Sequence, residues 1–354
     1  MNILGYLSKD YTDAKGREYY FDNAKFILIF LVVLAHAVSP LKSDMEEVKV
    51  LWTVINTLHM PCFILVSGYF AKSYIKNGKV KTQKLVTYVV YYLAAQLAFS
   101  LFEYFVLHHT TMARSILAPR ESLWYLACLC WWFLVLPYVS RLQPKYLLIT
   151  AFVFGLLIGY DTKTGDFMSI TRAINHFPFF LIGYYFKSEW LFKFRNKCTQ
   201  AASIIIIAIV GIWTYYNLDV IPSRIITSNY NYYNSNLKVL NSSYTMFLNR
   251  LLFYIIALIL CACFMLLVPR GKAFFTRFGS RTLQVYILHR FLYFIEKDFK
   301  LYEPFRSPKG AIAMSLIALA VTFILSLKPF EYPFKLLSKI NLKRFEKPEL
   351  ADKQ

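Results

Sequence analysis

The chain has 354 residues, of which 57% are hydrophobic, 18% aromatic and only 17% charged. A soluble domain of this size cannot bury so much apolar surface, so the composition excludes an ordinary soluble protein and indicates an integral membrane protein. The net charge of +20 would suit a nucleic-acid binder, but its distribution from loop to loop favours membrane topology as the explanation.

Ten apolar segments recur along the chain, and each approaches the length of about 20 residues that a helix needs to cross a bilayer. A backbone in lipid must satisfy its own hydrogen bonds, so each segment is predicted to be a helix. We therefore predict an all-α fold, a polytopic integral membrane helix bundle with about ten transmembrane helices. The predicted spans are 24–40, 50–74, 85–107, 123–140, 146–160, 177–193, 200–218, 246–268, 282–299 and 310–327.

Basic residues alternate in density from loop to loop. One set of loops and ends carries 24 of the 40 Lys and Arg residues, and the opposite set carries 12. Basic loops face the cytoplasm, so both termini are predicted to be cytoplasmic and the loop 219–245 to lie outside. This topology divides the chain into a cytoplasmic N-terminal segment 1–23, a transmembrane domain 24–327 and a basic cytoplasmic tail 328–354. We expect the lipid bilayer, and no nucleic acid, as the partner of these charges.

The first predicted span carries Lys25 and His36, eleven residues apart. On a helix this spacing places both on one face, about 16 Å apart along the axis. A cation near the cytoplasmic end and an imidazole farther across could hold a long anionic donor between them. Equally, Lys25 could extend to lipid phosphates, and His36 could make a buried hydrogen bond.

Two further spans carry polar stripes on one helix face. In the second span, His59 and Ser67 share a face with Asn56, and Pro61 loosens the helix beside His59. The ninth span carries a stripe at spacing i, i+3, i+4 and i+7, formed by Tyr286, His289, Arg290 and Tyr293. Each stripe could line a substrate path, or could be an interior hydrogen-bond network that packs the helices.

Polar side chains also occur near the outer ends of other spans. Trp124 lies near the start of the fourth span, and Arg172 precedes the sixth, where it either meets a polar acceptor or anchors the helix at the membrane interface. Cys128 and Cys130 are spaced as C-x-C, which on a helix places the two thiols on different faces. This is a poor ligand set, and we expect no metal site.

Five segments follow one another along the chain: FDNAKFILIFLVVLAHAV, HMPCFILVSGYFAK, LWYLACLCWW, NHFPFFLIGYYFK and LQVYILH. Together they resemble the acyltransferase 3 family of membrane-bound O-acyltransferases, over essentially the whole chain, and most closely its fucose 4-O-acetylase-like subgroup. The hallmark of the family is an Arg, ten residues and a His on the first helix. His36 matches the His, and Lys25 stands at the Arg position, where it keeps the positive charge without the bidentate fork.

The resemblance implies a protein that moves an acyl group, usually acetyl from acetyl-CoA, to a carbohydrate hydroxyl of a cell-surface polymer. We accordingly expect a bacterial inner-membrane O-acyltransferase with acetyl-CoA as donor, a cell-surface glycan or lipid-linked sugar as acceptor, and no permanently bound cofactor. His36 is expected to act as general base or transient acyl acceptor, and Lys25 and Ser67 to contact the donor. The residues expected along the substrate path are His59, Trp124, Tyr125, Arg172, Tyr286 and His289.

Two other functions remain open on the sequence. An exporter of a polysaccharide or lipid-linked sugar would also need polar stripes inside its bundle, although such transporters often show inverted repeats and none is convincing here. A non-enzymatic membrane assembly partner would not need a polar interior, so the stripes on the first and second spans argue against it.

Overall fold

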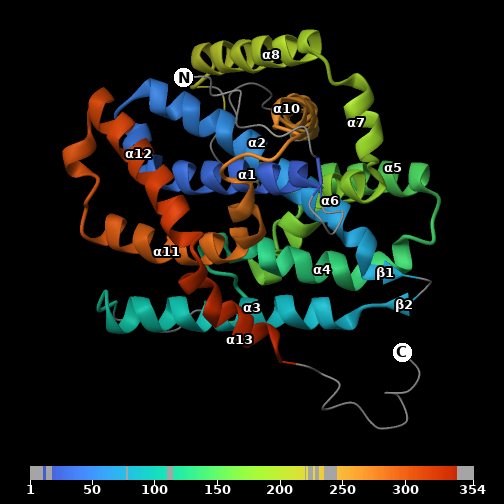
Figure 1. Ribbon diagram of the computed structural model, residues 1–354, viewed down its shortest axis with the longest axis horizontal. Helices are drawn as coiled ribbons and strands as arrows, with labels where there is room; N and C mark the ends of the chain where they lie inside the picture. The colour runs from blue at the N-terminus through green and yellow to red at the C-terminus, as the bar shows by residue number, and fades with distance from the viewer. Residues whose placement is uncertain are drawn as a thin grey trace. The chain divides into compact units, whose positions relative to one another are not determined.

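The computed structural model describes residues 11–12, 18–76, 79–109, 115–219, 221, 226–227, 231–234 and 245–340. Within these residues the regular structure is helical (Figure 1), apart from a bridge between Thr12 and Glu18 and one antiparallel hairpin. The hairpin pairs the two-residue strands β1 (Ile75–Lys76) and β2 (Lys79–Val80), with Ile75 opposite Val80. The predicted all-α fold class is therefore confirmed.

Each of the ten predicted spans overlaps a helix, and seven helices of the described part are long and apolar enough to cross a membrane. These seven, some with an adjoining 3₁₀ turn, are Tyr19–Ala37, Glu46–Tyr74, Thr82–Phe105, Glu121–Val139, Lys197–Tyr216, Phe247–Leu267 and Pro308–Leu325. The fifth predicted span lies in a shorter apolar helix, Pro144–Tyr160, and the ninth in the 17-residue helix α11 (Thr282–Asp298). The chain is thus a multi-pass membrane protein. The count of ten spans and the cytoplasmic location of both termini stay predictions.

The sixth predicted span, 177–193, differs most from the structure. Helix α6 (Ile170–Tyr185) begins seven residues earlier and ends at Tyr185, and a separate helix α7 (Ser188–Phe194) follows. The break has a backbone cause, because Lys187 before α7 is extended, with φ −113° and ψ 123°. The segment 177–193, predicted as one span, therefore belongs to two helices.

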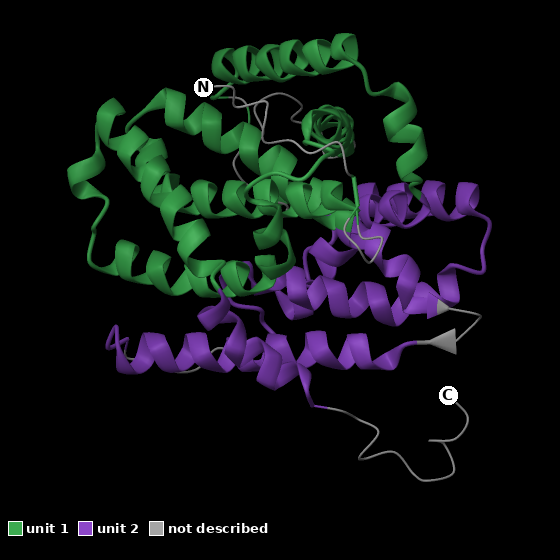
Figure 2. Cartoon of the chain, viewed as in Figure 1, with its two compact units in different colours: residues 1–66, 186–327 green, residues 67–185, 328–354 purple. Residues whose placement is uncertain are grey.

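The chain forms two compact units, each built from two stretches of sequence (Figure 2). Unit 1 comprises Met1–Val66 and Phe186–Leu327, and unit 2 comprises Ser67–Tyr185 and Lys328–Gln354. One boundary falls inside the long helix α2 (Glu46–Ala71), so this helix contributes to both units. The division cuts across the single transmembrane domain 24–327 that the sequence suggested, whose limits stay a prediction.

Helix α1 (Tyr19–Ala37) forms the centre of unit 1, because it is apolar on nearly all sides and twelve of its 19 residues are buried. It packs against α11, α12 (Pro308–Leu325) and the 3₁₀ segment Thr276–Arg281. The unit also contains most of α2, then α7, α8 (Lys197–Tyr216) and α10 (Phe247–Leu267), of which the last two pack together.

The first turns of α1 are fixed by a buried amide. Asn23 Nδ2 donates to the carbonyl oxygens of Pro269 (2.9 Å) and Gly271 (2.8 Å), and Thr276 Oγ1 donates to Asn23 Oδ1 (2.6 Å). Close approach is possible because residue 279 is glycine, where a Cβ would overlap the backbone of Asp22. These contacts hold the segment 269–279 against the end of α1 that carries Lys25.

Unit 2 contains α3 (Thr82–Phe105), α4 (Trp124–Val139), α5 (Pro144–Leu157), α6 and α13 (Tyr332–Ser338). Helix α4 packs against both α3 and α6, and α5 packs against α6. The α4–α6 contact is specific, since Trp132 Nε1 donates to the carbonyl oxygen of Ala173 (2.9 Å) and the Trp132 ring stacks on Phe180. Gly68 allows α2 and α6 to approach closely, because a Cβ there would overlap the carbonyl oxygen of Phe180.

The first part of the predicted tail 328–354 is folded into unit 2. Helix α13 packs against α3, where Tyr91 Oη donates to the carbonyl oxygen of Phe334 (3.0 Å). Gln83 Nε2 similarly donates to the carbonyl oxygen of Ile340 (2.7 Å). This segment therefore has a packing role that its basic charge alone did not indicate.

Candidate functional site

His36 lies in the last turn of α1, nearer to the end of the helix than the predicted span 24–40 implied. Arg290 on α11 donates from Nη1 to His36 Nδ1, with 3.0 Å between the nitrogens. A guanidinium can only donate, so His36 Nδ1 must carry the lone pair. The structure thus joins the two helices through a charge-assisted hydrogen bond to an imidazole.

His289 precedes Arg290 on the same helix and lies beside His36, with ring centroids 5.3 Å apart. Its Nδ1 donates to the carbonyl oxygen of Val285 (2.9 Å), one turn earlier. Its Nε2 is buried and has no hydrogen-bond partner within the described part of the chain. A buried imidazole nitrogen without a partner is unfavourable, which marks it as a candidate for contact with a ligand.

Arg290 is fully buried, and aromatic faces hold its guanidinium. The guanidinium carbon lies 4.4 Å from the centroid of the Tyr293 ring and 5.4 Å from that of Phe294. The Tyr293 ring also lies 5.5 Å from the ring of His36. Cation–π contacts and the imidazole thus hold a permanent positive charge inside unit 1. We call His36, His289 and Arg290 the histidine cluster.

A cavity of about 320 Å³ lies beside the histidine cluster within unit 1. His36 and His289 line it, together with Tyr293 and Glu296, and Oε1 of Glu296 is buried with no hydrogen-bond partner among the described residues. The remaining lining is apolar and comes mainly from α1, α11 and α12, for example Val33. A pocket with apolar walls and a few convergent polar groups is the usual form of a small-molecule site.

The predicted path residues His59 and Tyr286 lie around this cluster. His59 is buried on α2, and its Nδ1 donates to the carbonyl oxygen of Ile55 (2.6 Å). His59 and Lys42 both lie in the neighbourhood of His36. Tyr286 is buried one turn before His289, with ring centroids 6.4 Å apart. Neither His59 nor Tyr286 lines the cavity.

Lys25 forms an ion pair that the sequence analysis did not predict. Its Nζ forms an ion pair with Asp22 Oδ1 (2.8 Å), one turn earlier on α1, and the two side chains are 17% and 9% exposed. The pair has the i, i+3 spacing of neighbouring side chains on a helix, so this spacing could have revealed it. The Lys25 ammonium group, which is predicted to contact the acyl donor, thus pairs with the Asp22 carboxylate in the structure.

Ser67 and Tyr125, two further predicted residues, meet in unit 2. Their hydroxyl oxygens lie 2.6 Å apart and share a hydrogen bond between α2 and α4. Tyr125 is buried, and Trp124 precedes it at the start of α4. The two hydroxyls are therefore positioned by one another.

Trp124, Arg172 and His176 form a second group in unit 2, which we call the tryptophan cluster. The Arg172 guanidinium carbon lies 5.1 Å from the centroid of the Trp124 ring, and the His176 ring lies 5.3 Å from it. His176 Nδ1 donates to the carbonyl oxygen of Arg172 (3.1 Å). One contact of the Arg172 guanidinium is thus an aromatic face, and the choice between a polar acceptor and an interfacial anchor stays open.

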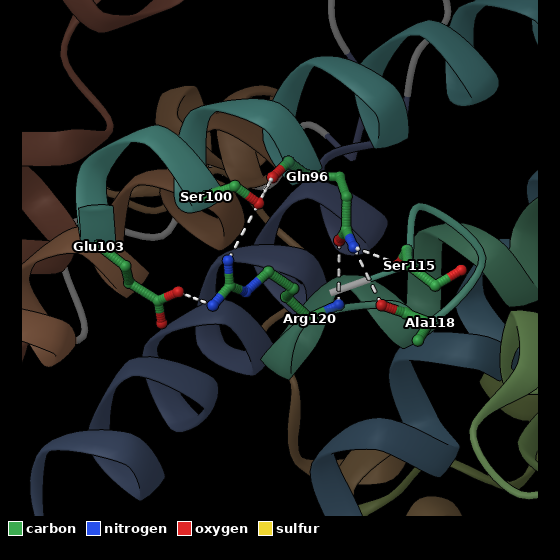
Figure 3. Close-up of polar contacts among 6 residues, drawn as sticks. All are labelled: Gln96, Ser100, Glu103, Ser115, Ala118 and Arg120. Atoms are coloured by element: carbon green, nitrogen blue, oxygen red, sulfur yellow. Dashed lines mark hydrogen bonds and ion pairs between the residues drawn. The ribbon is translucent and has the colours of Figure 1, made fainter. Parts of the chain in front are cut away.

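A polar network fixes the loop that leads into Trp124 (Figure 3). Arg120 forms an ion pair with Glu103 on α3 and donates from Nη1 to Ser100 Oγ (3.0 Å). Gln96 accepts from the Arg120 backbone N–H (3.0 Å) and donates to the carbonyl oxygen of Ala118 (2.9 Å). Burial lowers the pKa of Arg120 from its ordinary value. The network ties the start of α4, and with it Trp124, to α3.

The structure separates the predicted site residues into two sets. Unit 1 holds Lys25, His36, His59, Tyr286 and His289, and unit 2 holds Ser67, Trp124, Tyr125 and Arg172. The sequence reading did not foresee that Arg290 contacts His36, because 254 residues separate the two positions. It also left out Glu296, although that residue lies two helical turns after His289. The described part of the chain contains no group of three His, Cys, Asp or Glu residues that could hold a metal ion.

In a comparison with protein families, the model of an acyltransferase domain, that of acyltransferase 3, matches residues 18–327. The match begins just before α1, ends just after α12, and includes both the histidine cluster and the tryptophan cluster. Comparisons with curated proteins and with solved structures give no match.

Proposed function

The chain belongs to the acyltransferase 3 family, and from this premise we propose that it is an O-acyltransferase that moves acetyl from acetyl-CoA to a carbohydrate hydroxyl. The acceptor is a cell-surface glycan or its lipid-linked precursor, and the location is the bacterial inner membrane. The family match supports a membrane acyltransferase, whereas the donor, the acceptor and the location are parts of the proposal.

The observation that carries the proposal is the histidine cluster beside its cavity. Acyl transfer to a hydroxyl needs a group that takes the hydroxyl proton and donors that stabilise the oxyanion. Two imidazoles with ring centroids 5.3 Å apart, one of them hydrogen-bonded to a buried guanidinium, supply both kinds of group in one place. Imidazole is suited to this work near neutral pH, which supports a catalytic role for the histidine cluster.

The donor would approach the end of α1 that carries Lys25. In the proposal, Lys25 and Ser67 contact the donor, and the Asp22–Lys25 pair opens or reorients to admit its phosphates. Lys25→Ala is expected to raise the KM for acetyl-CoA, while Lys25→Arg keeps or lowers it, because a guanidinium holds phosphate in two places. An unchanged KM in the alanine variant would mean that Lys25 serves only its pair with Asp22.

The acceptor would be recognised by aromatic and hydroxyl groups. Trp124 and Tyr125 offer an aromatic face and a hydroxyl, and the Arg172 guanidinium lies 5.1 Å from the Trp124 ring. Such groups suit a ligand with both a flat apolar face and several hydroxyls. We further propose that His59, Tyr286 and His289 of unit 1 contact the substrates.

The alternative is an exporter of a polysaccharide or lipid-linked sugar, which the buried polar stripes would also fit. Mass spectrometry of the cell envelope from a deletion strain distinguishes the two functions. The transferase predicts that a glycan remains on the surface but lacks an acetyl group. An exporter predicts that the whole glycan is missing from the surface, and this result would contradict the proposal.

A further inference from the structure

The two imidazoles of the histidine cluster carry their protons on different nitrogens. His36 Nδ1 accepts from Arg290, so in neutral His36 the proton is on Nε2. His289 Nδ1 donates to the carbonyl oxygen of Val285, so in neutral His289 the lone pair is on Nε2. The Nε2 atoms of the two rings are therefore not equivalent: one can donate and the other can accept.

This difference separates two roles that acyl transfer requires. A hydroxyl that attacks a carbonyl carbon must lose its proton to an acceptor, and His289 Nε2 is an unpartnered acceptor within the described residues. His36 cannot accept a proton at Nε2 while Arg290 occupies Nδ1. Its Nε2–H group can instead donate to a developing oxyanion.

We infer that His289 is the catalytic proton acceptor of this site, and that Arg290 is a positioning residue that holds His36 as the hydrogen-bond donor to the oxyanion. The inference rests on the proposed acyl transfer and deepens it, because it assigns separate roles to the two imidazoles. It also assigns Arg290 a role in catalysis, which Arg290 exerts through its hydrogen bond to His36.

The reaction balances with these two residues. The acceptor hydroxyl oxygen forms a C–O bond to the thioester carbonyl carbon while its proton moves to His289 Nε2. The carbonyl electron pair shifts to oxygen, which accepts a hydrogen bond from His36 Nε2–H. The carbonyl then re-forms, the C–S bond breaks with its electron pair on sulfur, and the thiolate takes the proton from His289. The products are an ester and free coenzyme A, and both imidazoles return to their starting forms.

Two other groups near the cluster are weaker candidates for the proton acceptor. His59 has the same backbone hydrogen bond as His289, but it does not line the cavity. Glu296 lines the cavity with an unpartnered Oε1, but it lies two turns along α11 from the His36–His289 contact. His289 is the residue that combines an available lone pair, the cavity and direct contact with His36.

Glutamine variants test the two roles separately in the purified full-length chain. In His36→Gln the amide keeps an N–H donor near the position of Nε2, so we expect acetyl transfer within about tenfold of the wild type, and at least 10-fold above His36→Ala. In His289→Gln no group can take a proton, so we expect a loss of about 10²–10⁴-fold in kcat, as in His289→Ala. In Glu296→Gln the loss in kcat is expected to be at least tenfold smaller than in His289→Gln, because the carboxylate takes no proton in the proposed reaction.

The reverse result, with His289→Gln active and His36→Gln as inactive as His36→Ala, would make His36 the base and overturn the inference. Inactivity of both glutamine variants would also overturn it, because His36 would then supply more than a donor. A loss in Glu296→Gln equal to that in His289→Gln would assign the proton to the carboxylate. A wild-type chain that transfers no acyl group is a different outcome, since it contradicts the proposed function itself.

A second measurement does not depend on the folding of variants or on activity. Nitrogen NMR of the wild-type chain with ¹⁵N-labelled histidine reports which ring nitrogen of each of the six His residues is protonated. We expect protonated Nε2 in His36 and protonated Nδ1 in His289. A His36 protonated at Nδ1, or a His289 protonated at Nε2, would overturn the assignment.

Discussion

The histidine cluster of unit 1 and the tryptophan cluster of unit 2 both combine arginine, histidine and aromatic rings, yet they use the arginine differently. Arg290 donates to the ring of His36, whereas Arg172 lies over the ring of Trp124 and its own carbonyl accepts from His176. The first arrangement fixes which imidazole nitrogen carries a proton. In the second, the guanidinium lies against an aromatic face, an arrangement that suits recognition, and His176 donates to a backbone carbonyl oxygen.

The cavities of the two units reinforce this difference. The cavity beside the histidine cluster is lined in part by His36, His289 and Glu296. A larger cavity in unit 2, about 410 Å³, is lined by nonpolar and aromatic side chains such as Trp131 and Phe154, with Thr150 as the exception. No member of the tryptophan cluster lines that second cavity. Chemistry is therefore expected in unit 1, and unit 2 is expected to contribute to binding.

In the comparison of the two clusters, the largest expected difference is between the kcat values of the Arg290 and Arg172 variants. Arg290→Gln is expected to lower kcat by about 10²-fold, because His36 loses the donor that fixes its proton. Arg172→Gln is expected to change kcat by less than about tenfold and to raise the KM for the acceptor. Steady-state kinetics of both variants, with Arg290→Lys as the charge-conserving control, checks the contrast. Equal losses of kcat in the two variants would remove the distinction between the clusters.

The next effect concerns the ion pair that supports the start of α4. Glu103→Gln leaves the Arg120 charge buried without its partner, so we expect a loss of about 3 kcal/mol in unfolding free energy. The matched variant in unit 1 is Asp44→Asn, which removes a carboxylate that is 33% exposed from its pair with Arg306, 41% exposed, and this pair is worth at most about 1 kcal/mol. Thermal unfolding in detergent compares the two variants. Equal shifts would mean that the Arg120 network is not a determinant of stability.

A smaller difference in unfolding free energy is expected between alanine substitutions at two glycines. Gly68→Ala introduces a Cβ against the carbonyl oxygen of Phe180, and we expect a loss of about 2 kcal/mol. Gly211→Ala in α8 meets no atom within 4 Å and removes a flexible residue from a helix interior, so it should stabilise the chain by about 0.5–1 kcal/mol. The same unfolding assay measures both. A tolerated alanine at position 68 would show that α2 and α6 approach less closely than described.

The smallest effect is expected at the Ser67–Tyr125 hydrogen bond. Ser67→Ala and Tyr125→Phe each remove one neutral hydrogen bond, worth about 1 kcal/mol, so the KM for acetyl-CoA should rise by less than about tenfold. If Ser67 contacts the donor, the serine variant should show a larger KM increase than the tyrosine variant. Equal changes in the two variants would limit Ser67 to packing.

The sequence predicted the helices well, because long apolar segments and one-face polar stripes are local signals. The stripe of Tyr286, His289, Arg290 and Tyr293 was visible from its spacing. Contacts between helices far apart in sequence were not visible. The His36–Arg290 bond and the pinning of segment 269–279 by Asn23 depend on tertiary packing, which periodicity does not encode.

The break between α6 and α7 shows a second limit of the sequence reading. Hydropathy over 177–193 gave one span, but the backbone at Lys187 is extended and divides it. Hydropathy reports the apolar character of a segment and does not report local backbone conformation. The predicted outer position of 229–243 falls largely outside the described residues and stays a prediction, which labelling of single cysteines by an impermeant reagent would test.

The proposed acyl transfer depends on the histidine cluster of unit 1. The most direct measurement places the purified chain in lipid nanodiscs with radiolabelled acetyl-CoA and an envelope glycan fraction. We predict that the wild type releases coenzyme A and labels the glycan, while His36→Ala, although folded and inserted, does neither. Label transfer by His36→Ala at the wild-type rate would contradict the claim.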